Sequence, residues 1–330
     1  MEEREIDASP NSIEIFGERF RRIVSNVETV IQGKREAIEL TVLAMVSEGH
    51  VLIEDVPGVG KTQLAKSLAR SIDGEFHRVQ FTPDLLPSDV TGVSVWDRSE
   101  GEFEFKPGPI FANVVVGDEI NRASPKTQSA LLEAMEERQV TSDGVTRALT
   151  PPFMVIATQN PLEHEGTYPL PESQLDRFMM RVVIGYPSKD KELEMLDTHA
   201  VQSTFHDLQA VADLDEVTEM IEIARHITVS VAVKNYIVDL IEGTRLHPDV
   251  LLGASPRAAL FLQRIARSRA VSGGRDYVLP DDIKELAPSV LEHRMSLRPE
   301  AQMRGESVTA ILDDVMGRIR VPGTTSRIAT

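Results

Sequence analysis

The chain has no cysteine among its 330 residues and only one tryptophan. The absence of cysteine excludes disulfide bonds and thiolate-bound metal ions. The eight histidines are scattered and do not recur at the short spacings of paired metal ligands. Isolated histidines such as His164 and His247 are therefore expected to be surface or capping residues.

Long apolar runs are also missing. No stretch of 18 apolar residues occurs, which is the length a membrane-spanning helix needs. The first residues, Met1–Arg4, lack the basic and then apolar pattern of a secretory signal. We therefore expect no membrane span and a cytoplasmic location. The length and the 41% hydrophobic content fit one large globular domain or two ordinary ones.

Dense basic clusters are absent as well. The formal net charge is −17 at pH 7, and Lys and Arg form no continuous run. Such a chain repels a phosphate backbone, so nucleic-acid binding is disfavoured. Solubility explains the acidity more simply than a basic protein partner does.

The most informative segment, residues 50–65, places an apolar strand, a loop with two glycines and an amphipathic helix in immediate succession. Backbone N–H groups at a helix N-terminus, together with the Lys61 ammonium group, suit a nucleotide phosphate. Thr62 is expected to bind a magnesium ion. The predicted nucleotide-binding residues are Gly58, Val59, Gly60, Lys61, Thr62 and Gln63.

One position of this loop departs from the usual pattern. Asp55 stands five residues before Gly60, where a glycine is common. Because Asp adopts left-handed backbone conformations more readily than most residues, the turn is expected to form. We expect the carboxylate to point away from bound phosphates and to tune nucleotide handling rather than abolish it.

Short apolar runs alternate with helical segments up to about residue 187. This alternation predicts an α/β fold with a mostly parallel sheet and helices on both faces. Residues 82–111 indicate an insertion, and residues 139–150 indicate a hairpin around the Asp143-Gly144 turn. Strands are expected at 76–81, 113–117, 153–157 and 181–184, and helices at 16–30, 38–44, 61–71 and 125–138.

Beyond residue 187 helical periodicity dominates and no clear strand pattern recurs. We therefore expect an α/β domain over 13–187 and a small all-helical domain over 188–322. Residues 1–12 and 323–330 are expected to be flexible tails. Helices of the second domain are expected at 189–201, 215–226, 231–244, 256–271, 281–286 and 304–316.

Two further apolar runs end in polar residues: Asp118 and Glu119 follow one, and Asn160 follows the other. Functional groups of a parallel sheet gather at the carboxyl ends of its strands. Asp118 can hold magnesium through water, and Glu119 can deprotonate an attacking water. Asn160 can bond a γ-phosphate or that water, or it can be a turn residue before Pro161.

Taken together, these segments resemble the MoxR-type ATPases of the AAA+ superfamily over about residues 30–325. The resemblance implies a P-loop αβα three-layer core, a helical lid and assembly into a ring, usually a hexamer. It also implies an insertion in helix 2 and a hairpin before the Asn160 strand. Besides the phosphate loop, it is carried by Asp118-Glu119-Ile120-Asn121-Arg122-Ala123, Ala157-Thr158-Gln159-Asn160-Pro161 and Leu170-Pro171-Glu172-Ser173-Gln174-Leu175-Asp176-Arg177-Phe178.

The resemblance gives roles to two arginines. Arg177 takes the arginine-finger position and would reach the nucleotide of a neighbouring subunit. The alternatives are a surface ion pair with Asp176 or Glu172, or Arg181 as the finger. Arg257 matches sensor 2, because Ser255 and Pro256 form a typical helix start before it.

Other positions follow the family pattern in the same way. The segment Val30–Lys34 resembles the part of these ATPases that packs on adenine. Lys61 and Thr62 match Walker A, Asp118 and Glu119 match Walker B, and Asn160 matches sensor 1.

The expected function is therefore Mg²⁺-dependent ATP hydrolysis, with ATP and ADP as ligands, that remodels a protein client in the manner of a chaperone. Partners with von Willebrand factor A domains and roles in maturing metalloenzymes or complexes are implied by the resemblance. A magnesium-chelatase ATPase subunit is the first alternative. A DNA-remodelling or transcription-activating ATPase is the second, although residues 82–111 hold no Gly-Ala-Phe-Thr-Gly-Ala-like loop. A scaffold that binds ATP without hydrolysis is the third.

Overall fold

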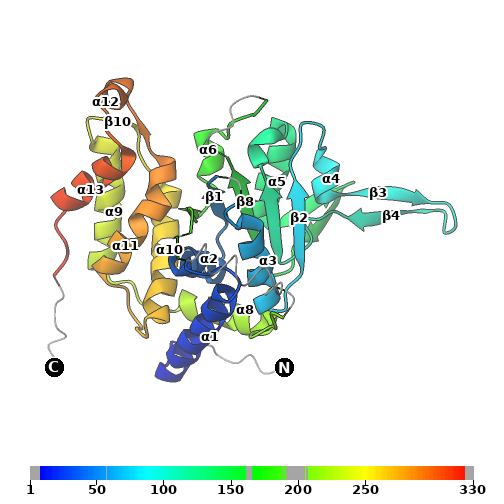
Figure 1. Cartoon of the computed structure of the whole chain (residues 1–330), viewed down its shortest axis with the longest axis horizontal. Coiled ribbons are helices and arrows are strands. Elements are labelled where there is room, and N and C mark those ends of the chain that lie inside the picture. The colour runs from blue at the N-terminus through cyan, green and yellow to red at the C-terminus, as the bar shows by residue number, and fades with distance from the viewer. Residues whose placement is uncertain are drawn as a thin grey trace. The chain divides into compact units, whose positions relative to one another are not determined.

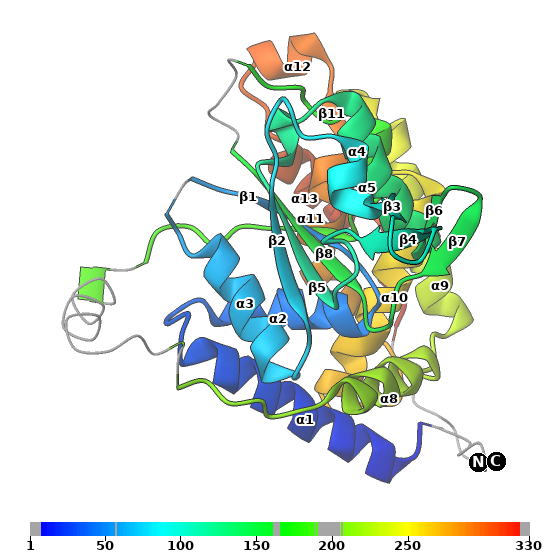
Figure 2. The ribbon, with the colours of Figure 1, turned by 90° about the vertical axis from the view of Figure 1, so that its right-hand side faces the viewer.

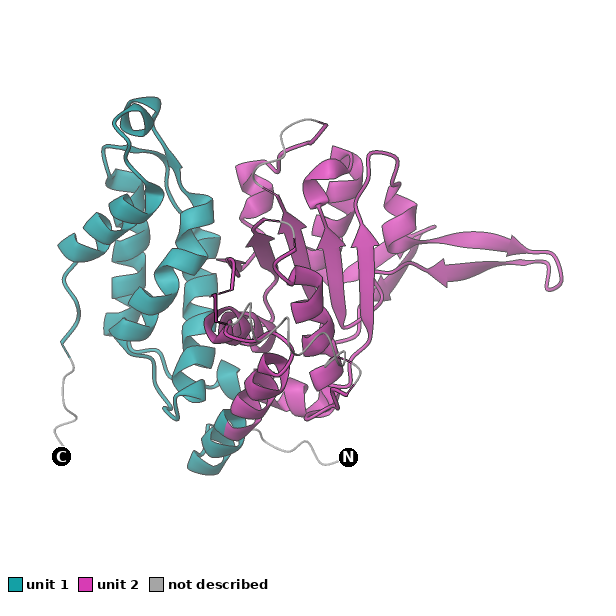
Figure 3. Ribbon diagram, viewed as in Figure 1, with its two compact units in different colours: residues 1–17, 223–330 teal, residues 18–222 magenta. Residues whose placement is uncertain are grey.

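The computed structural model describes residues 8–56, 58–160, 166–187, 189–190, 205 and 207–323. The chain forms two compact units (Figure 3). The sheet unit is Glu18–Glu222, and the helical unit combines Met1–Gly17 with Ile223–Thr330. Most of the helix expected at 189–201 lies outside the described residues, as do residues 324–330 of the expected tail. The domain boundary near residue 187 therefore stays a prediction.

The sheet unit is built on five parallel strands in the order β2-β5-β8-β1-β9. The carboxyl ends of all five strands therefore lie along one edge of the sheet, as expected for a parallel arrangement. β8 lies between β1 and β5. Its residue Ile156 is opposite Val51 of β1 on one side and opposite Val116 of β5 on the other. The strands are β1 Val51–Glu54, β2 Phe76–Gln80, β5 Val114–Asp118, β8 Met154–Gln159 and β9 Met180–Val182.

Helices cover both faces of this sheet, which confirms the predicted layers. α3 (Lys61–Ser71) and α5 (Pro125–Glu137) lie on opposite faces (Figure 2). On the α5 side, Val115 of β5 joins Leu131 and Leu132 in a buried apolar cluster. Because alternate strand residues point to opposite faces and helices cover both, Val114, Val115 and Val116 are all buried. The other helical elements are α2 Arg35–Val46, α6 Glu172–Leu175 and the 3₁₀ helix η1 Ile120–Arg122.

The first helix, α1 (Pro10–Glu28), begins earlier than the sequence suggested. The sequence predicts a flexible tail up to residue 12, but residues 10–12 form the first turn of this helix. Ser9 Oγ accepts a hydrogen bond from the Ser12 N–H at 3.3 Å, and a proline opens the helix. This capping signal is local and needs no apolar periodicity, which explains why a periodicity criterion missed it.

The segment between β2 and β5 contains an insertion, as predicted, with a short helix α4 (Pro87–Thr91) and a two-stranded antiparallel ribbon. We call β3 (Gly92–Asp97) and β4 (Glu102–Pro107) the β3–β4 ribbon; it extends away from the five-stranded sheet (Figure 1). The hairpin predicted at residues 139–150 is also present, as β6 (Gln139–Ser142) and β7 (Val145–Ala148). Both residues of its Asp143-Gly144 turn have positive φ, +55° and +75°.

The helical unit contains helices at the four segments expected there, 231–244, 256–271, 281–286 and 304–316, and short elements that the sequence did not predict, among them α12 (Pro299–Met303), η2 (Glu292–Arg294) and two strands. Two short strands, β10 (Val250–Leu252) and β11 (Ser296–Leu297), pair antiparallel, so the unit is not entirely helical. Runs of two and three residues carry no usable alternation. The helices are α9 Val231–Leu246, α10 Pro256–Ser272, α11 Pro280–Leu291, η2 Glu292–Arg294, α12 Pro299–Met303 and α13 Val308–Arg318, and α8 Leu214–Arg225 crosses the boundary between the units. Within the described residues, no helix combines the length and hydropathy needed to span a membrane.

Candidate functional site

The phosphate loop joins β1 to α3 at the carboxyl edge of the sheet. Gly58 and Gly60 have φ of +86° and +93°, a left-handed conformation that strains any residue with a Cβ atom. Gly60 caps α3, and its carbonyl accepts the Leu64 N–H at 2.9 Å. The first turn of the helix therefore begins with Lys61, Thr62 and Gln63, where backbone N–H groups point out of the helix end and favour an anion.

The Lys61 ammonium group lies among acidic groups of the same edge. Its Nζ donates a hydrogen bond to the backbone carbonyl of Asp55. Burial lowers the pKa of Lys61, and the negative charges of Asp55, Asp118 and Glu119 oppose that shift. The structure thus brings the phosphate-loop lysine and the acidic pair of β5 together, although β8 lies between their strands.

Asp118, the last residue of β5, is held through both carboxylate oxygens. Thr158 Oγ1 on β8 donates to Oδ1 at 2.6 Å. Arg78 on β2 donates to Oδ2 from Nη2 at 2.6 Å and from Nε at 3.1 Å. Contacts from both neighbouring strands therefore fix the orientation of this carboxylate.

Glu119 follows Asp118 in a left-handed conformation, with φ +56° and ψ +51°. Its carboxylate oxygen Oε2 accepts hydrogen bonds from Gln80 Nε2 at 2.8 Å and from Arg122 Nη1 at 3.0 Å. Its backbone N–H donates to Thr158 Oγ1 at 3.0 Å. A non-glycine residue in this conformation is uncommon and is held here by contacts to three other elements.

Asn160 comes directly after β8 and is 7% exposed. β8 pairs with β1 on one side and with β5 on the other, so its end lies between the phosphate loop and the acidic pair. The Asp55 N–H also donates to the Gln159 carbonyl at 3.3 Å. This position fits a polar group directed at a terminal phosphate, and the role of Asn160 stays a prediction.

The donor set at this edge suits magnesium. The Thr62 hydroxyl and the Asp118 carboxylate are hard oxygen ligands, and Mg²⁺ in proteins is commonly bound by one or two such groups together with waters and substrate phosphates. Among the described residues, no cluster of three or more His, Cys, Asp or Glu side chains could hold a metal ion alone.

The two candidate finger arginines have different partners. Arg177 lies just after α6, and its Nε is 3.1 Å from Oε2 of Glu136 on α5. Arg181 lies within β9, and its Nη1 is 3.1 Å from Oε2 of Glu54 on β1. Arg181 therefore pairs with the neighbouring strand of the sheet, whereas Arg177 pairs with a helix. The two arginine side chains are almost equally exposed, 28% and 29%.

Two other predicted elements have local geometry of the expected kind. Ser255 Oγ accepts the Ala258 N–H at 3.3 Å, so Arg257 is the second residue of a capped helix in the helical unit. In the sheet unit, Ile31 is buried, and its Cδ1 is 3.7 Å from the place a Cβ atom would take on Gly60. The segment Val30–Lys34 thus lies beside the phosphate loop. The roles of Arg257 and of this segment stay predictions.

Sequence reasoning missed the residues that hold the acidic pair: Arg78, Gln80, Arg122 and Thr158. Arg122 and Thr158 lie inside motifs that were identified, but their side chains were given no role. Arg78 and Gln80 come from β2, whose carboxyl end lies beside that of β5. Polar residues at the end of a second strand of the same parallel sheet were the available signal.

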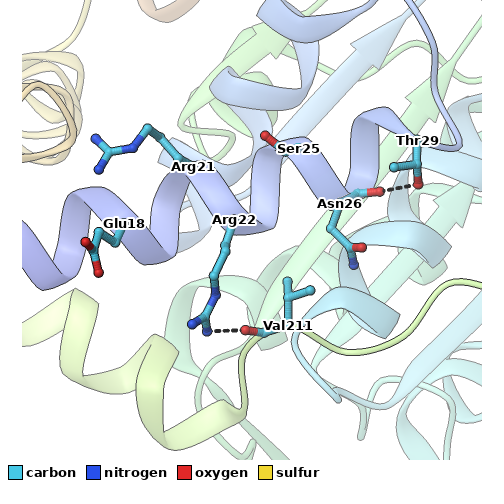
Figure 4. A pocket seen from close by; sticks show the side chains of 7 residues that line it. All are labelled: Glu18, Arg21, Arg22, Ser25, Asn26, Thr29 and Val211. Atoms are coloured by element: carbon cyan, nitrogen blue, oxygen red, sulfur yellow. Dashed lines mark hydrogen bonds between the residues drawn. The ribbon is translucent and has the colours of Figure 1, made fainter.

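A separate cavity of about 620 Å³ lies along α1, elsewhere in the sheet unit (Figure 4). Arg22 Nη2 donates there to the carbonyl of Val211, and Thr29 Oγ1 donates to that of Asn26 at 2.6 Å. None of the candidate site residues lines it. The candidate site is therefore defined by the phosphate loop and the sheet edge rather than by this cavity.

Comparison with known families matches two segments of the chain. Residues 50–180 match the family described as ATPase family associated with various cellular activities (AAA). Residues 242–315 match the AAA lid domain. The first match contains the phosphate loop, the acidic pair and Asn160, and the second contains Arg257.

Individual relatives cover nearly the whole chain. An uncharacterized protein, YeaC of Bacillus subtilis, is 49% identical over 301 residues, which are 91% of this chain and 94% of that protein. Chaperone MoxR1 of Mycobacterium tuberculosis is 40% identical over 91% of this chain and 82% of its own length. The crystal structure of a proposed ATPase from Cytophaga hutchinsonii superposes with a TM-score of 0.89 at 38% identity, covering 95% of this chain and 98% of that one.

Proposed function

Because the chain belongs to the MoxR family of AAA+ ATPases, we propose that it hydrolyses ATP with magnesium at the carboxyl edge of β1, β5 and β8. The observation that carries this proposal is the fixed acidic pair beside Lys61. Thr158 and Arg78 orient the Asp118 carboxylate, and Gln80 and Arg122 hold that of Glu119. The negative charges of both residues act on Lys61 and raise its pKa against the effect of burial.

Each residue has a distinct task in this reaction. The loop N–H groups and Lys61 bind the β- and γ-phosphates, and Thr62 and Asp118 hold the magnesium ion. The ion neutralises charge on the phosphate oxygens when it is bound. Glu119 accepts a proton from the attacking water, and Asn160 orients that water or the γ-phosphate.

Catalysis is completed by a second copy of the chain. Arg177 reaches the nucleotide of a neighbouring subunit in a ring, which we propose to be a hexamer, and neutralises charge that develops on the γ-phosphate. Arg177 is partly exposed, and its Nε lies 3.1 Å from Oε2 of Glu136. Arg257 would act as sensor 2 on the nucleotide of its own subunit.

The proposed use of this cycle is to remodel a protein client. One relative is named as a chaperone, and the present chain covers most of that protein. We propose partners with von Willebrand factor A domains and a role in assembling or maturing protein complexes or metalloenzymes. Copurification with the Glu119→Gln variant, which prolongs the ATP-bound state, tests this part; an empty result contradicts stable client engagement.

The test of the site is steady-state ATP turnover with magnesium. We expect Lys61→Ala and Glu119→Gln to lower turnover by about 100-fold or more, because phosphate binding and proton transfer are lost. Lys66→Ala is the matched control, since Lys66 lies on the same helix and packs over the Phe76 ring. Wild-type turnover in both site variants would overturn the assignment.

A mixing experiment tests the action of Arg177 between subunits. Arg177→Ala keeps an intact phosphate loop, and Glu119→Gln keeps an intact finger. Each variant alone is expected to turn over ATP poorly, whereas a mixture places an intact finger next to an intact site and recovers part of the activity. A mixture no more active than the separate variants would show that Arg177 does not act in trans.

A further inference from the structure

Asp55, the residue that departs from the usual phosphate-loop pattern, is tied to a distant segment of the chain. Its carboxylate accepts three backbone N–H groups. Oδ1 accepts Val56 N at 2.8 Å, and Oδ2 accepts Ile184 N at 2.8 Å and Gly185 N at 2.5 Å. Only 7% of the residue is exposed. A glycine at this position could make none of these three contacts.

Both backbone polar groups of Asp55 are hydrogen-bonded as well. Its N–H donates to the Gln159 carbonyl at the end of β8, at 3.3 Å, and its carbonyl accepts the Lys61 ammonium group. One residue therefore connects the strand that leads to Asn160, the phosphate-binding lysine and the segment after β9. The Lys61 ammonium group has three N–H donors, so the bond to the Asp55 carbonyl leaves two of them for a phosphate.

The segment after β9 is held from its other side by Lys34. Lys34 Nζ donates to the Tyr186 carbonyl at 2.7 Å, and the preceding residue, Gly185, has a positive φ of +66°. Lys34 belongs to the segment whose Ile31 lies beside Gly60.

We propose that Asp55 is a positioning residue that couples nucleotide binding at the phosphate loop to the Ile184–Tyr186 segment. This inference rests on the proposed nucleotide-binding function. A phosphate bound by Lys61 acts on a group that is itself bonded to Asp55, and the Asp55 carboxylate carries the effect to the Ile184 and Gly185 amides. Asp is needed here because its side chain bridges two segments 129 residues apart in sequence.

A purely structural role makes a different prediction. If the carboxylate only braced the fold, its removal would lower stability and leave the response of Ile184 and Gly185 to nucleotide unchanged. Coupling between two sites instead requires that the response itself is lost. The deciding quantity is therefore the change in amide exchange on adding nucleotide, compared between wild type and variant.

The experiment measures hydrogen exchange of the Ile184 and Gly185 amides in the full chain, without nucleotide and with Mg·ADP. The variants are Asp55→Gly, which restores the usual loop residue, and Asp55→Asn, which keeps the shape and one acceptor oxygen. Asp313→Asn on α13 is the charge-matched control, and Ile53 in β1 is an internal reference amide. A fluorescent ADP analogue gives the Kd of each protein.

In the nucleotide-free protein we expect Asp55→Gly to speed exchange of both amides by about tenfold or more, because bonds to a charged acceptor are lost. Asp55→Asn should give a smaller change, and Asp313→Asn none. Mg·ADP should change exchange at Ile184 and Gly185 in wild type and not in Asp55→Gly, and the Kd of that variant should rise by about three- to tenfold.

Two results would overturn the proposal. The first is wild-type exchange at Ile184 and Gly185 in Asp55→Gly without nucleotide. The second is an equal response of these amides to Mg·ADP in wild type and variant. Failure of the proposed hydrolysis looks different, because Lys61→Ala and Glu119→Gln would then keep their turnover while the exchange results still stand.

Discussion

The carboxyl edge of the five-stranded sheet and the β3–β4 ribbon differ in which side chains they hold in place and which they expose. At the sheet edge, Asp118, Glu119 and Asp55 have carboxylates held by hydrogen bonds from neighbouring strands and loops. On the ribbon, Trp96 and Phe103 form an edge-to-face pair at 5.1 Å, yet they are 51% and 69% exposed. One region fixes polar groups, and the other leaves large apolar groups in solvent.

The difference follows from what each region must do. A site that acts on a nucleotide needs charges fixed before the reaction begins, because reorienting them during the reaction raises the barrier. An exposed aromatic pair contributes little to folding, so its retention is not explained by stability within this chain. We therefore expect changes at the sheet edge to alter stability and turnover together, and changes on the ribbon to alter neither strongly.

Among the substitutions that compare these two regions, Thr158→Val is expected to have the largest effect. Thr158 is 1% exposed, donates to Asp118 and accepts from the Glu119 N–H. Valine has nearly the same shape but leaves the partly buried Asp118 carboxylate and Glu119 N–H without that partner, so the free energy of unfolding should fall by about 1–3 kcal/mol. Turnover should fall by about 10- to 100-fold because both acidic residues lose orientation.

Chemical denaturation and ATP turnover measure these two effects, and Thr158→Ser is the control that keeps the hydroxyl group. If valine left stability and turnover at their wild-type values, the sheet edge would not depend on this contact. The contrast with the ribbon would then lose its main support.

A smaller effect is expected from Glu136→Ala. Glu136 pairs with Arg177 at 3.1 Å with both side chains partly exposed, so the unfolding free energy should fall by less than about 1 kcal/mol. Turnover should fall by about tenfold, because a displaced Arg177 no longer meets the neighbouring nucleotide in the right geometry. The Kd for nucleotide should not change.

Glu133→Ala, on the same exposed surface of α5, is the matched control and should keep wild-type turnover. Equal losses in the two variants would mean that acidity of the helix surface, and not the position of Arg177, controls the rate. Loss of stability without loss of turnover would mean that Glu136 only braces the fold.

The sequence predicts the polar ends of β1, β5 and β8 because each apolar run is followed directly by its functional residue. It does not predict that β8 lies between β1 and β5, since strand order depends on tertiary pairing and not on local periodicity. For the same reason, β10 and β11 were missed. Runs of two or three residues become strands only when a partner is in place.

The contacts that organise the site could not be predicted from local sequence patterns either. Arg78 and Gln80 bond to residues about forty positions away, and Asp55 bonds to Ile184 across 129 positions. Asp55 was recognised from the sequence as an anomaly, but an anomaly in a motif does not say which partner it serves. The partner is set by the pairing of β1 with β9, which brings the segment after β9 beside the loop.

The smallest effect is expected from replacing the exposed aromatic pair of the ribbon. Trp96→Ser and Phe103→Ser should each lower the unfolding free energy by about 1 kcal/mol or less, because only an exposed edge-to-face contact is lost. Phe105 on β4 is the matched comparison, since it packs against Phe111 at 5.7 Å and lies 3.6 Å below the Arg147 guanidinium group. Phe105→Ala should therefore lower the unfolding free energy more than either exposed substitution.

Turnover of the two serine variants should match wild type, because none of the contacts described at the sheet edge involves Trp96 or Phe103. A loss of turnover in these variants without a loss of stability would contradict the separation between the two regions and would show that the ribbon acts on the nucleotide site.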